Sequence, residues 1–167
     1  YFAAVLTSAS FDRWEELLDR FGPVLGDVDY RGRPVAFDMT DYYRSEMGPG
    51  IERTILSFSR HGDPSGLPRI KLATAALEEA FEEKGGRRVN IDPGYVDFYK
   101  AVLASFKEGP QKIFLGQGVY ADPVLRYVDG KWDVFPWTFP DLRKGLYMDD
   151  FDAIRRIYRL TMRGGSS

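Results

Sequence analysis

The sequence contains no cysteine and only one histidine, His61. The absence of cysteine excludes disulfides, thiolate nucleophiles and thiolate zinc sites, and it is typical of proteins in a reducing compartment such as the cytoplasm. One histidine cannot build a histidine-rich metal site. A Ser-His-Asp triad would have to use His61, but this residue directly precedes the helix expected to begin near Asp63-Pro64. We therefore expect His61 to be solvated or to cap that helix.

Long hydrophobic runs and an excess of charge of one sign are also missing. No apolar run approaches the ~20 residues that a membrane-spanning helix needs, and no segment has the pattern of a signal peptide. The net charge of -2 comes from mixed acidic and basic residues, which disfavours nucleic acid and anionic membranes as partners. We expect a soluble, cytoplasmic protein that binds no membrane and for which nucleic acid is a disfavoured partner.

The residues that are present give the composition of an ordinary globular chain. The 167 residues are 44% hydrophobic and 29% charged, which suits one domain with a full core and without a metal or disulfide staple. We predict a single α+β domain over residues 1–163. Residues 164–167 are expected to be a flexible tail or a cloning remnant.

Hydrophobic periodicity predicts alternating strands and helices in the first half of the chain. Helices are expected to begin near residues 10 and 64, and Asp92-Pro93-Gly94-Tyr95 has the residues of a type II turn. Strands are expected over residues 1–7, 28–39, 53–60 and 87–92. Further strands follow between residues 112 and 135, and a C-terminal helix begins at Asp149 or Asp150.

The order strand, helix, strand, strand, helix, strand matches the ferredoxin-like pattern. We therefore predict an α+β fold with a mainly antiparallel sheet and helices packed on one face. A ferredoxin-like core with a β-hairpin extension is the candidate topology. One side of the C-terminal helix carries Arg155, Arg156 and Arg159.

Two polar segments carry the candidate ligand-binding chemistry. The first spans residues 37–48. Its acidic residues Asp38, Asp41 and Glu46 offer hard oxygen ligands or acid–base groups, and Tyr42 and Tyr43 offer rings that can stack on a base or sugar. The alternative interpretation is that this segment caps a short helix and that its tyrosines pack.

The second polar segment is Arg87-Arg88-Val89-Asn90-Ile91-Asp92-Pro93-Gly94-Tyr95. If its alternating apolar residues face the core, then Arg88, Asn90 and Asp92 share the other side, where they can hold a phosphate or a metal-bound substrate. The alternative is a polar outer face that ends in an Asp-Pro-Gly turn.

Two other patterns have simpler interpretations. The cluster Glu78, Glu79, Glu82 and Glu83 is interpreted as the solvated face of a helix. The stretch 116–121 satisfies the dinucleotide pattern G-x-G-x-x-A, but it leads into another strand instead of a helix. We therefore expect a glycine bulge or hairpin turn there.

Several of these segments resemble a prokaryotic family, domain-of-unknown-function family 4416. The matching stretches are residues 37–48, 88–95, 115–121 and 136–141, which occur in order and span nearly the whole chain. Met39, where phenylalanine is expected, is a minor departure. The resemblance implies a stand-alone bacterial or archaeal protein of about this size and no defined activity.

The leading hypothesis is a small-ligand-binding protein or enzyme that acts on a phosphorylated or nucleotide-like molecule, with Mg²⁺ or Mn²⁺ as candidate cofactors. Whether the protein is an enzyme stays open, and no catalytic residue is assigned. A metal, if bound, would use Asp38, Asp41, Glu46 and Asp92. The candidate ligand-binding residues are Asp38, Asp41, Tyr43, Glu46, Arg53, Arg88, Asn90, Asp92, Tyr95 and Tyr120.

Two other functions stay open. The first alternative is a non-catalytic protein–protein interaction module that uses an aromatic surface or an exposed sheet edge. The second is RNA binding, which the basic C-terminal helix and several tyrosines permit and the net acidity disfavours.

Overall fold

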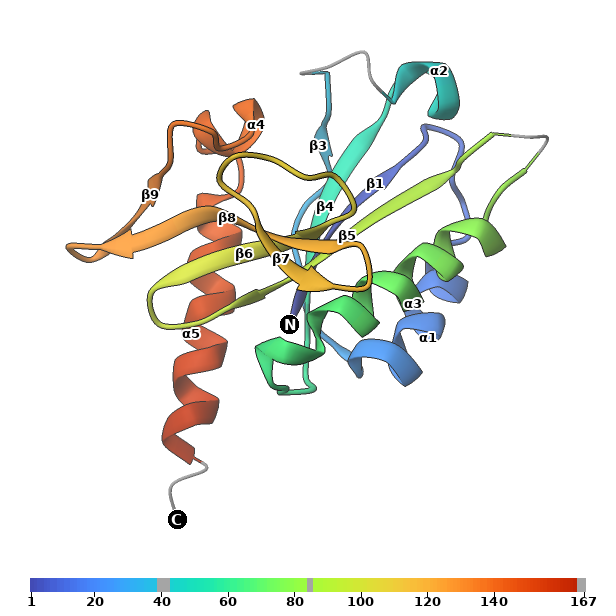
Figure 1. Ribbon diagram of the computed structural model, residues 1–167. Coiled ribbons are helices and arrows are strands. Elements are labelled where there is room, and N and C mark those ends of the chain that lie inside the picture. The colour runs from blue at the N-terminus through green and yellow to red at the C-terminus, as the bar shows by residue number, and fades with distance from the viewer. Residues whose placement is uncertain (39–42, 84–85, 165–167) are drawn as a thin grey trace.

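The computed structural model describes residues 1–38, 43–83 and 86–164. Within them the chain is an α+β protein with an open antiparallel sheet of nine strands and five α-helices (Figure 1). The strands are β1 (Phe2–Thr7), β2 (Val28–Arg31), β3 (Val35–Ala36), β4 (Glu52–Phe58), β5 (Val89–Val96), β6 (Lys100–Ser105), β7 (Ile113–Gly116), β8 (Val119–Val128) and β9 (Lys131–Val134). The helices are α1 (Trp14–Leu25), α2 (Arg44–Met47), α3 (Leu67–Ala80), α4 (Pro140–Arg143) and α5 (Met148–Gly164).

The strand order in the sheet is β2-β4-β1-β5-β6-β8-β7, with β3 paired to β4 and β9 paired to β8. The strand β1 lies between β4 and β5, and all six of its residues are buried. A strand that is buried on both faces has no polar alternation, which explains its sequence Phe-Ala-Ala-Val-Leu-Thr. The first strand of the chain is thus a central strand of the sheet.

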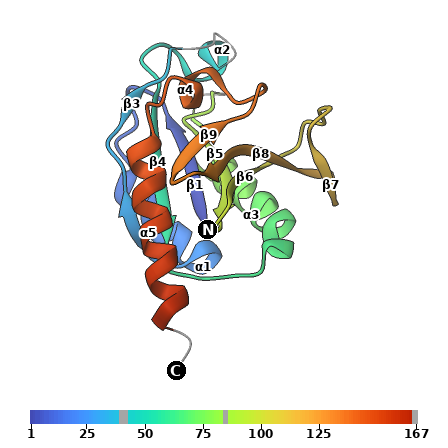
Figure 2. The same ribbon diagram turned by 90° about the vertical axis from the view of Figure 1, so that its left-hand side faces the viewer.

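Helices cover both faces of the sheet. Ala3 and Val5 pack in a cluster with residues of α1 and α3, whereas Phe2 and Ala4 pack in a second cluster with residues of α5. Because successive side chains of a strand point to opposite faces, α5 lies across the sheet from α1 and α3 (Figure 2). The prediction that the helices pack on one face is wrong for α5, since β1 presents apolar side chains on both sides.

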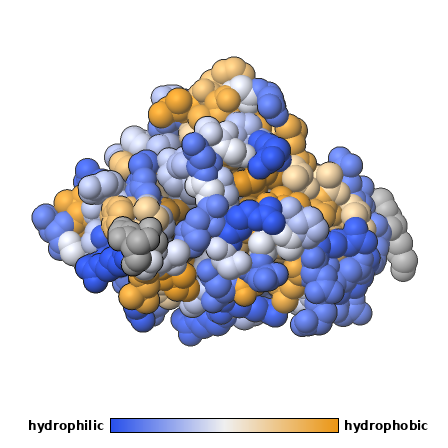
Figure 3. Space-filling model, turned by 90° about the horizontal axis from the view of Figure 1, so that it is seen from below, coloured by the Kyte–Doolittle hydropathy of each residue, from blue (hydrophilic) through white to orange (hydrophobic). Residues whose placement is uncertain are grey.

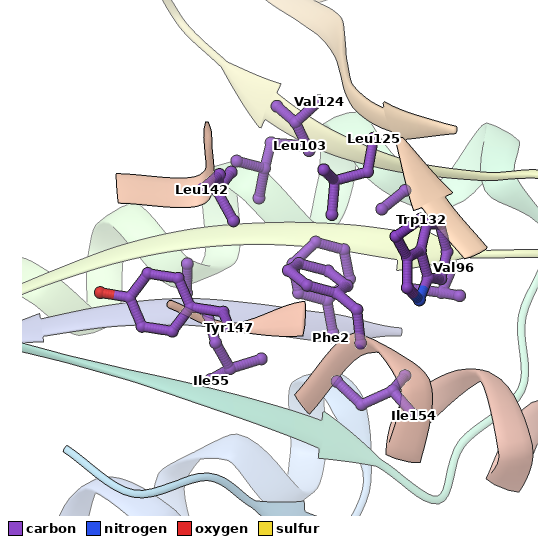
Figure 4. Packing of buried hydrophobic residues seen from close by; sticks show 13 residues of the cluster. Phe2, Ile55, Val96, Leu103, Val124, Leu125, Trp132, Leu142, Tyr147 and Ile154 are labelled. Atoms are coloured by element: carbon purple, nitrogen blue, oxygen red, sulfur yellow. The ribbon is translucent and has the colours of Figure 1, made fainter. Parts of the chain in front are cut away.

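The cluster beneath α5 is centred on aromatic side chains. Figure 4 shows Phe2 among side chains from several strands and from α5, with Tyr147 and Trp132 nearby. The Phe2 and Phe151 rings meet edge to face with their centroids 5.3 Å apart, and Trp132 lies 5.8 Å from Phe151. These contacts fix α5 against the sheet.

The sheet forks between β5 and β6. These two strands pair only over Gly94–Val96 and Ala101–Leu103. Before Gly94, β5 continues along β1, and beyond Leu103, β6 continues along β8 as far as Ser105. Pairing with β6 stops at Pro93, which has no N–H to donate to a neighbouring strand.

The type II turn expected at residues 92–95 is therefore wrong, because β5 runs straight through Pro93 and Gly94. Pairing with β1 holds this stretch extended, with Ala3 opposite Pro93 and Phe2 opposite Gly94. Glycine is required at position 94, since a Cβ there would lie 2.3 Å from the carbonyl oxygen of Val102. The local turn signal is overridden by the neighbouring strands.

The expected hairpin at the G-x-G-x-x-A pattern is present between β7 and β8. Gln117 and Gly118 both have positive φ, at 55° and 73°, and Val119 begins the next strand. No helix follows the glycines, so the segment lacks the helix N-terminus on which a dinucleotide site depends.

Among the described helices, none is long and apolar enough to cross a membrane.

Candidate functional site

A cleft of about 400 Å³ occupies the fork between β5 and β6. Its walls come from α3, the first half of β5, the second half of β6, the segment after β6, and β8. Figure 1 shows α3 beside the part of β5 that has left β6. The cleft therefore lies where the sheet leaves backbone groups of β5 without a neighbouring strand.

Two side chains of α3 take the place of that strand at Ile91. The Ile91 N–H donates to Glu78 Oε1 at 2.7 Å, and Lys71 Nζ donates to the Ile91 carbonyl oxygen at 2.9 Å. Lys71 and Glu78 are seven residues apart, so they project from the same side of the helix two turns apart. The backbone N–H and carbonyl of Ile91, on the unpaired edge of β5, thus form hydrogen bonds with charged side chains that also line the cleft.

A connected set of polar contacts extends from Lys71 along the cleft. Lys71 Nζ lies 3.1 Å from Asp92 Oδ1, and Asn90 Nδ2 donates to Asp92 Oδ2 at 3.0 Å. Arg87 Nη1 donates to Asn90 Oδ1 at 2.9 Å, and Arg87 Nε lies 3.4 Å from Glu46 Oε2. Each of these side chains thus fixes the position of the next one along the cleft.

A second ammonium–carboxylate pair, Lys112 and Asp122, also lines the cleft. Lys112 Nζ lies 3.3 Å from Asp122 Oδ2, and it donates to Ser105 Oγ at 3.0 Å. Gln111 Nε2 donates to the other oxygen of Asp122 at 3.2 Å. The side chains of Lys112 and Asp122 are only 11% and 5% exposed, so this pair is well shielded from water.

Glu78, which lines the cleft, has a pKa displaced toward neutrality. Burial raises its pKa to about 7. The attraction of Lys71, the hydrogen bond from the Ile91 N–H and the attraction of Arg87 lower the pKa, but they are too small to cancel that effect. The side chain is 12% exposed, and Oε2 lies 3.8 Å from Arg87 Nη1. A carboxyl group with a pKa near neutrality has both protonation states available at pH 7, as a general acid or base requires.

The cleft brings together residues from both polar segments of the sequence. Tyr43, Asn90 and Asp92 line it, and Glu46 contacts it through its ion pair with Arg87. The segment near residue 40 and the Asn-Ile-Asp segment therefore meet in space. Asp41, a further candidate, lies outside the described residues.

Three other candidate residues lie elsewhere. The Arg53 side chain is buried in an ion pair with Asp141, so its guanidinium does not reach the cleft. Arg88 Nε lies 3.6 Å from Glu83 Oε2, and Asp38 is exposed beside a separate small hollow of about 90 Å³.

The two remaining tyrosine candidates pack against other side chains. Lys100 Nζ lies 5.7 Å from the centroid of the Tyr95 ring, and the Tyr120 ring lies 5.2 Å from that of Phe114. Neither tyrosine lines the cleft. Among the described residues, no group of three or more acidic or histidine side chains is arranged to hold a metal ion.

Sequence reasoning missed Lys71, Glu78, Lys112 and Asp122. The interpretation of the glutamate cluster as a solvated face is wrong for Glu78, although the next residue, Glu79, is exposed. One available signal was the spacing of Lys71, Ala75 and Glu78 at i, i+4 and i+7. This spacing forms a second stripe on the helix that contains no large apolar residue.

Comparisons with known proteins give a family and no activity. The family model described as "Domain of unknown function (DUF4416)" matches residues 1–158. That range includes every residue that lines the cleft. No curated protein and no solved structure matches the chain.

Proposed function

Since the chain belongs to the DUF4416 family, whose description assigns no activity, we propose a function from the cleft itself. The cleft binds a small phosphorylated or nucleotide-like molecule, and Glu78 takes up a proton when that molecule binds. Lys71 and Lys112 supply the positive charge for the phosphate, while Asn90 and Asp92 hold polar groups of the ligand.

The observation that supports this proposal is the presence of two ammonium groups and the carboxyl group of Glu78, all largely buried, in one cleft. The side chains of Lys71 and Lys112 are 6% and 11% exposed. Ammonium groups bind phosphate as point charges, and their attraction for an anion is stronger where water is excluded. The cleft volume of about 400 Å³ lies within the range of small-molecule sites.

The negative charge of a bound ligand should change the protonation of the Glu78 carboxyl group. A phosphate placed near its carboxyl group disfavours the ionised form, so the bound ligand raises the pKa of Glu78 further and a proton is taken up. Oε1 is held by the Ile91 N–H, which leaves Oε2 to exchange the proton. We therefore expect the ligand affinity of the native protein to fall between pH 6 and pH 8 relative to that of Glu78→Gln, whose remaining pH dependence is that of the phosphate itself.

The test is thermal unfolding in the presence of a ligand panel. The panel contains inorganic phosphate, pyrophosphate, ribose 5-phosphate and nucleoside mono-, di- and triphosphates, each with and without Mg²⁺ or Mn²⁺. A ligand at 100 times its Kd stabilises the folded state by about 2.7 kcal/mol, which raises the Tm of a chain of this size by about 5–10 °C.

Lys112→Met removes a cleft ammonium, and Lys131→Met on β9 is the matched control because Lys131 is exposed and lies outside the cleft. The shift should disappear in Lys112→Met and persist in Lys131→Met. A panel without any shift, or a shift that Lys112→Met leaves unchanged, would rule out the proposal.

A second candidate function, binding of a protein partner, is favoured by the edge strand β7. Ile113 and Phe114 are 62% and 61% exposed, and β7 ends the order of strands in the sheet. An exposed apolar edge can accept a strand from another chain. We expect wild type to associate at high concentration in light scattering and Ile113→Lys to stay monomeric; a monomeric wild type would count against this candidate.

Figure 3 shows whether another part of the surface could bind a protein partner. On the face seen from below, apolar side chains gather in several separate places among hydrophilic ones. A protein-interaction module that used this face would be expected to present one larger continuous apolar area. The edge of β7 is therefore the better candidate.

We also propose that β1, α1, β2, β4, α3 and β5 form a ferredoxin-like unit. Their strands lie in the order β2-β4-β1-β5, and α1 and α3 pack in the same cluster on one face. The strands β6–β9 then extend this unit. Because β1 contributes to the clusters on both faces, we propose one domain over residues 1–163.

A further inference from the structure

A second hollow, of about 410 Å³, lies on another part of the molecule. It is formed by the turn between β5 and β6, by β8 and by the C-terminal half of α5, and Figure 1 shows that turn beside α5. Three aromatic and three basic side chains dominate its lining, namely Phe98, Tyr99, Tyr127, Arg155, Arg159 and Arg163. Within the described part of the chain, no residue lines both this hollow and the cleft in the fork of the sheet.

The charge of this hollow is opposite to that of the whole chain. Arg155, Arg159 and Arg163 follow one another at i, i+4 and i+8, so they form one stripe along α5. Among the described residues that line the hollow, none is acidic. The hollow therefore carries three positive charges in a chain whose net charge is -2, and the expectation drawn from the net charge does not apply to it.

The aromatic side chains are held in place and partly open to solvent. Arg155 lies over the Tyr127 ring at 3.4 Å from its centroid, and its Nη2 donates to the Phe98 carbonyl oxygen at 3.2 Å. Tyr99 stands at the tip of the turn with 72% of its surface exposed. Asp97 Oδ1 accepts a hydrogen bond from the Tyr99 N–H at 2.7 Å, which fixes the backbone that carries this ring.

We propose that this hollow binds single-stranded nucleic acid. Arg159 and Arg163 contact successive phosphates, and bases stack on Tyr99 and on the Arg155–Tyr127 pair. A basic stripe beside accessible aromatic rings is the arrangement by which proteins bind single strands without reading their sequence. An anionic membrane would also attract the arginines, but it offers no planar groups for the rings to stack on.

The test measures fluorescence anisotropy of labelled 12-nucleotide oligomers of uridine and of thymidine at several salt concentrations. Arg159→Ala/Arg163→Ala should weaken binding at least tenfold at 20 mM NaCl. It should also reduce the slope of log K against log salt by about 1.4, because each lost phosphate contact on a single strand accounts for about 0.7. Arg156→Ala is the matched control, since Arg156 is exposed on the same helix and does not line the hollow.

Stacking is tested separately from charge. Tyr99→Ala should weaken binding about tenfold with an unchanged salt slope, whereas Tyr99→Phe should bind as wild type does, because stacking needs the ring and not the hydroxyl. The ratio of the affinities for the two oligomers then distinguishes RNA from DNA. Lys112→Met, in the other cleft, should bind both oligomers normally, so this proposal and the proposed function can fail independently.

Three results would overturn the proposal. The first is no anisotropy change at 20 mM NaCl, and the second is an equal loss of binding in Arg156→Ala and in the double variant. The third is binding to phosphatidylserine vesicles that depends on the same arginines while neither oligomer binds. Circular dichroism of each variant confirms folding, which these substitutions should preserve because Arg159 and Arg163 are exposed.

Discussion

Glu78→Gln is expected to stabilise the protein at neutral pH and to leave its stability unchanged in acid. The pKa of Glu78 is raised by burial from an ordinary value of 4.5 to about 7 in the folded chain. Between these two values the unfolded chain loses the proton while the folded chain keeps it, so stability falls as the pH rises. The contribution of protonated Glu78 is fully present below pH 4.5 and is lost as the pH passes through about 7.

The magnitude follows from that interval. At 1.36 kcal/mol per pH unit, the difference between 4.5 and about 7 corresponds to about 3 kcal/mol. Glutamine has the shape of the protonated side chain and can still accept the Ile91 N–H, so the variant lacks the charge and keeps the contact. Glu78→Gln should therefore match wild type near pH 4.5 and exceed its free energy of unfolding by about 3 kcal/mol above pH 7.

The assay is urea denaturation of both proteins at intervals from pH 4.5 to pH 8, with Tm values as a second readout. For a chain of this length, 3 kcal/mol corresponds to a rise in Tm of about 6–12 °C. Glu79→Gln removes the same charge from an exposed neighbour. Its free energy of unfolding should differ little from that of wild type, and the difference should not change with pH. If the stability difference for Glu78→Gln does not depend on pH, or is largest in acid, then burial does not raise the pKa of Glu78 as described.

Three further single substitutions test one contact in the cleft and two in the core. Lys71→Met leaves the Ile91 carbonyl oxygen without its side-chain donor and should cost about 1–3 kcal/mol in urea denaturation; unchanged stability would mean that water replaces the ammonium. Arg53→Met leaves the buried carboxylate of Asp141 without its ion-pair partner and should lower the free energy of unfolding by about 3–5 kcal/mol. The double variant Arg53→Met/Asp141→Leu should recover most of that loss. A double variant no more stable than the single one would contradict this explanation. Phe2→Ala opens a cavity at a side chain with no exposed surface and should cost about 3–5 kcal/mol, so a loss below 1 kcal/mol would show that the core collapses around it.

Much of the fold could be predicted because hydrophobic periodicity and capping residues, which are local features of the sequence, indicate where helices and strands begin and end. Asp63 caps the turn before α3 by accepting the Ser65 N–H at 2.8 Å, as the Asp-Pro pair predicted. The position of α5 on the far face could not be predicted, because an apolar helix stripe does not say which sheet face it will cover.

The candidate site was predicted only in part. Asn90 and Asp92 alternate on one strand, and their closeness follows from strand geometry, so sequence reasoning found them. Lys71 and Glu78 were missed because their role depends on an unpaired strand edge, and the place where two strands separate is set by the sheet as a whole.

Composition, periodicity and turn residues are local properties, so they were enough to predict an α+β protein without thiol chemistry, most of its helices and strands, and the two polar segments. Three features appeared only in the folded chain: β5 and β6 diverge at Pro93, α3 supplies the missing backbone partners, and burial moves the pKa of Glu78 toward neutrality. Desolvation and strand pairing both depend on residues that are distant in the sequence and meet only after folding.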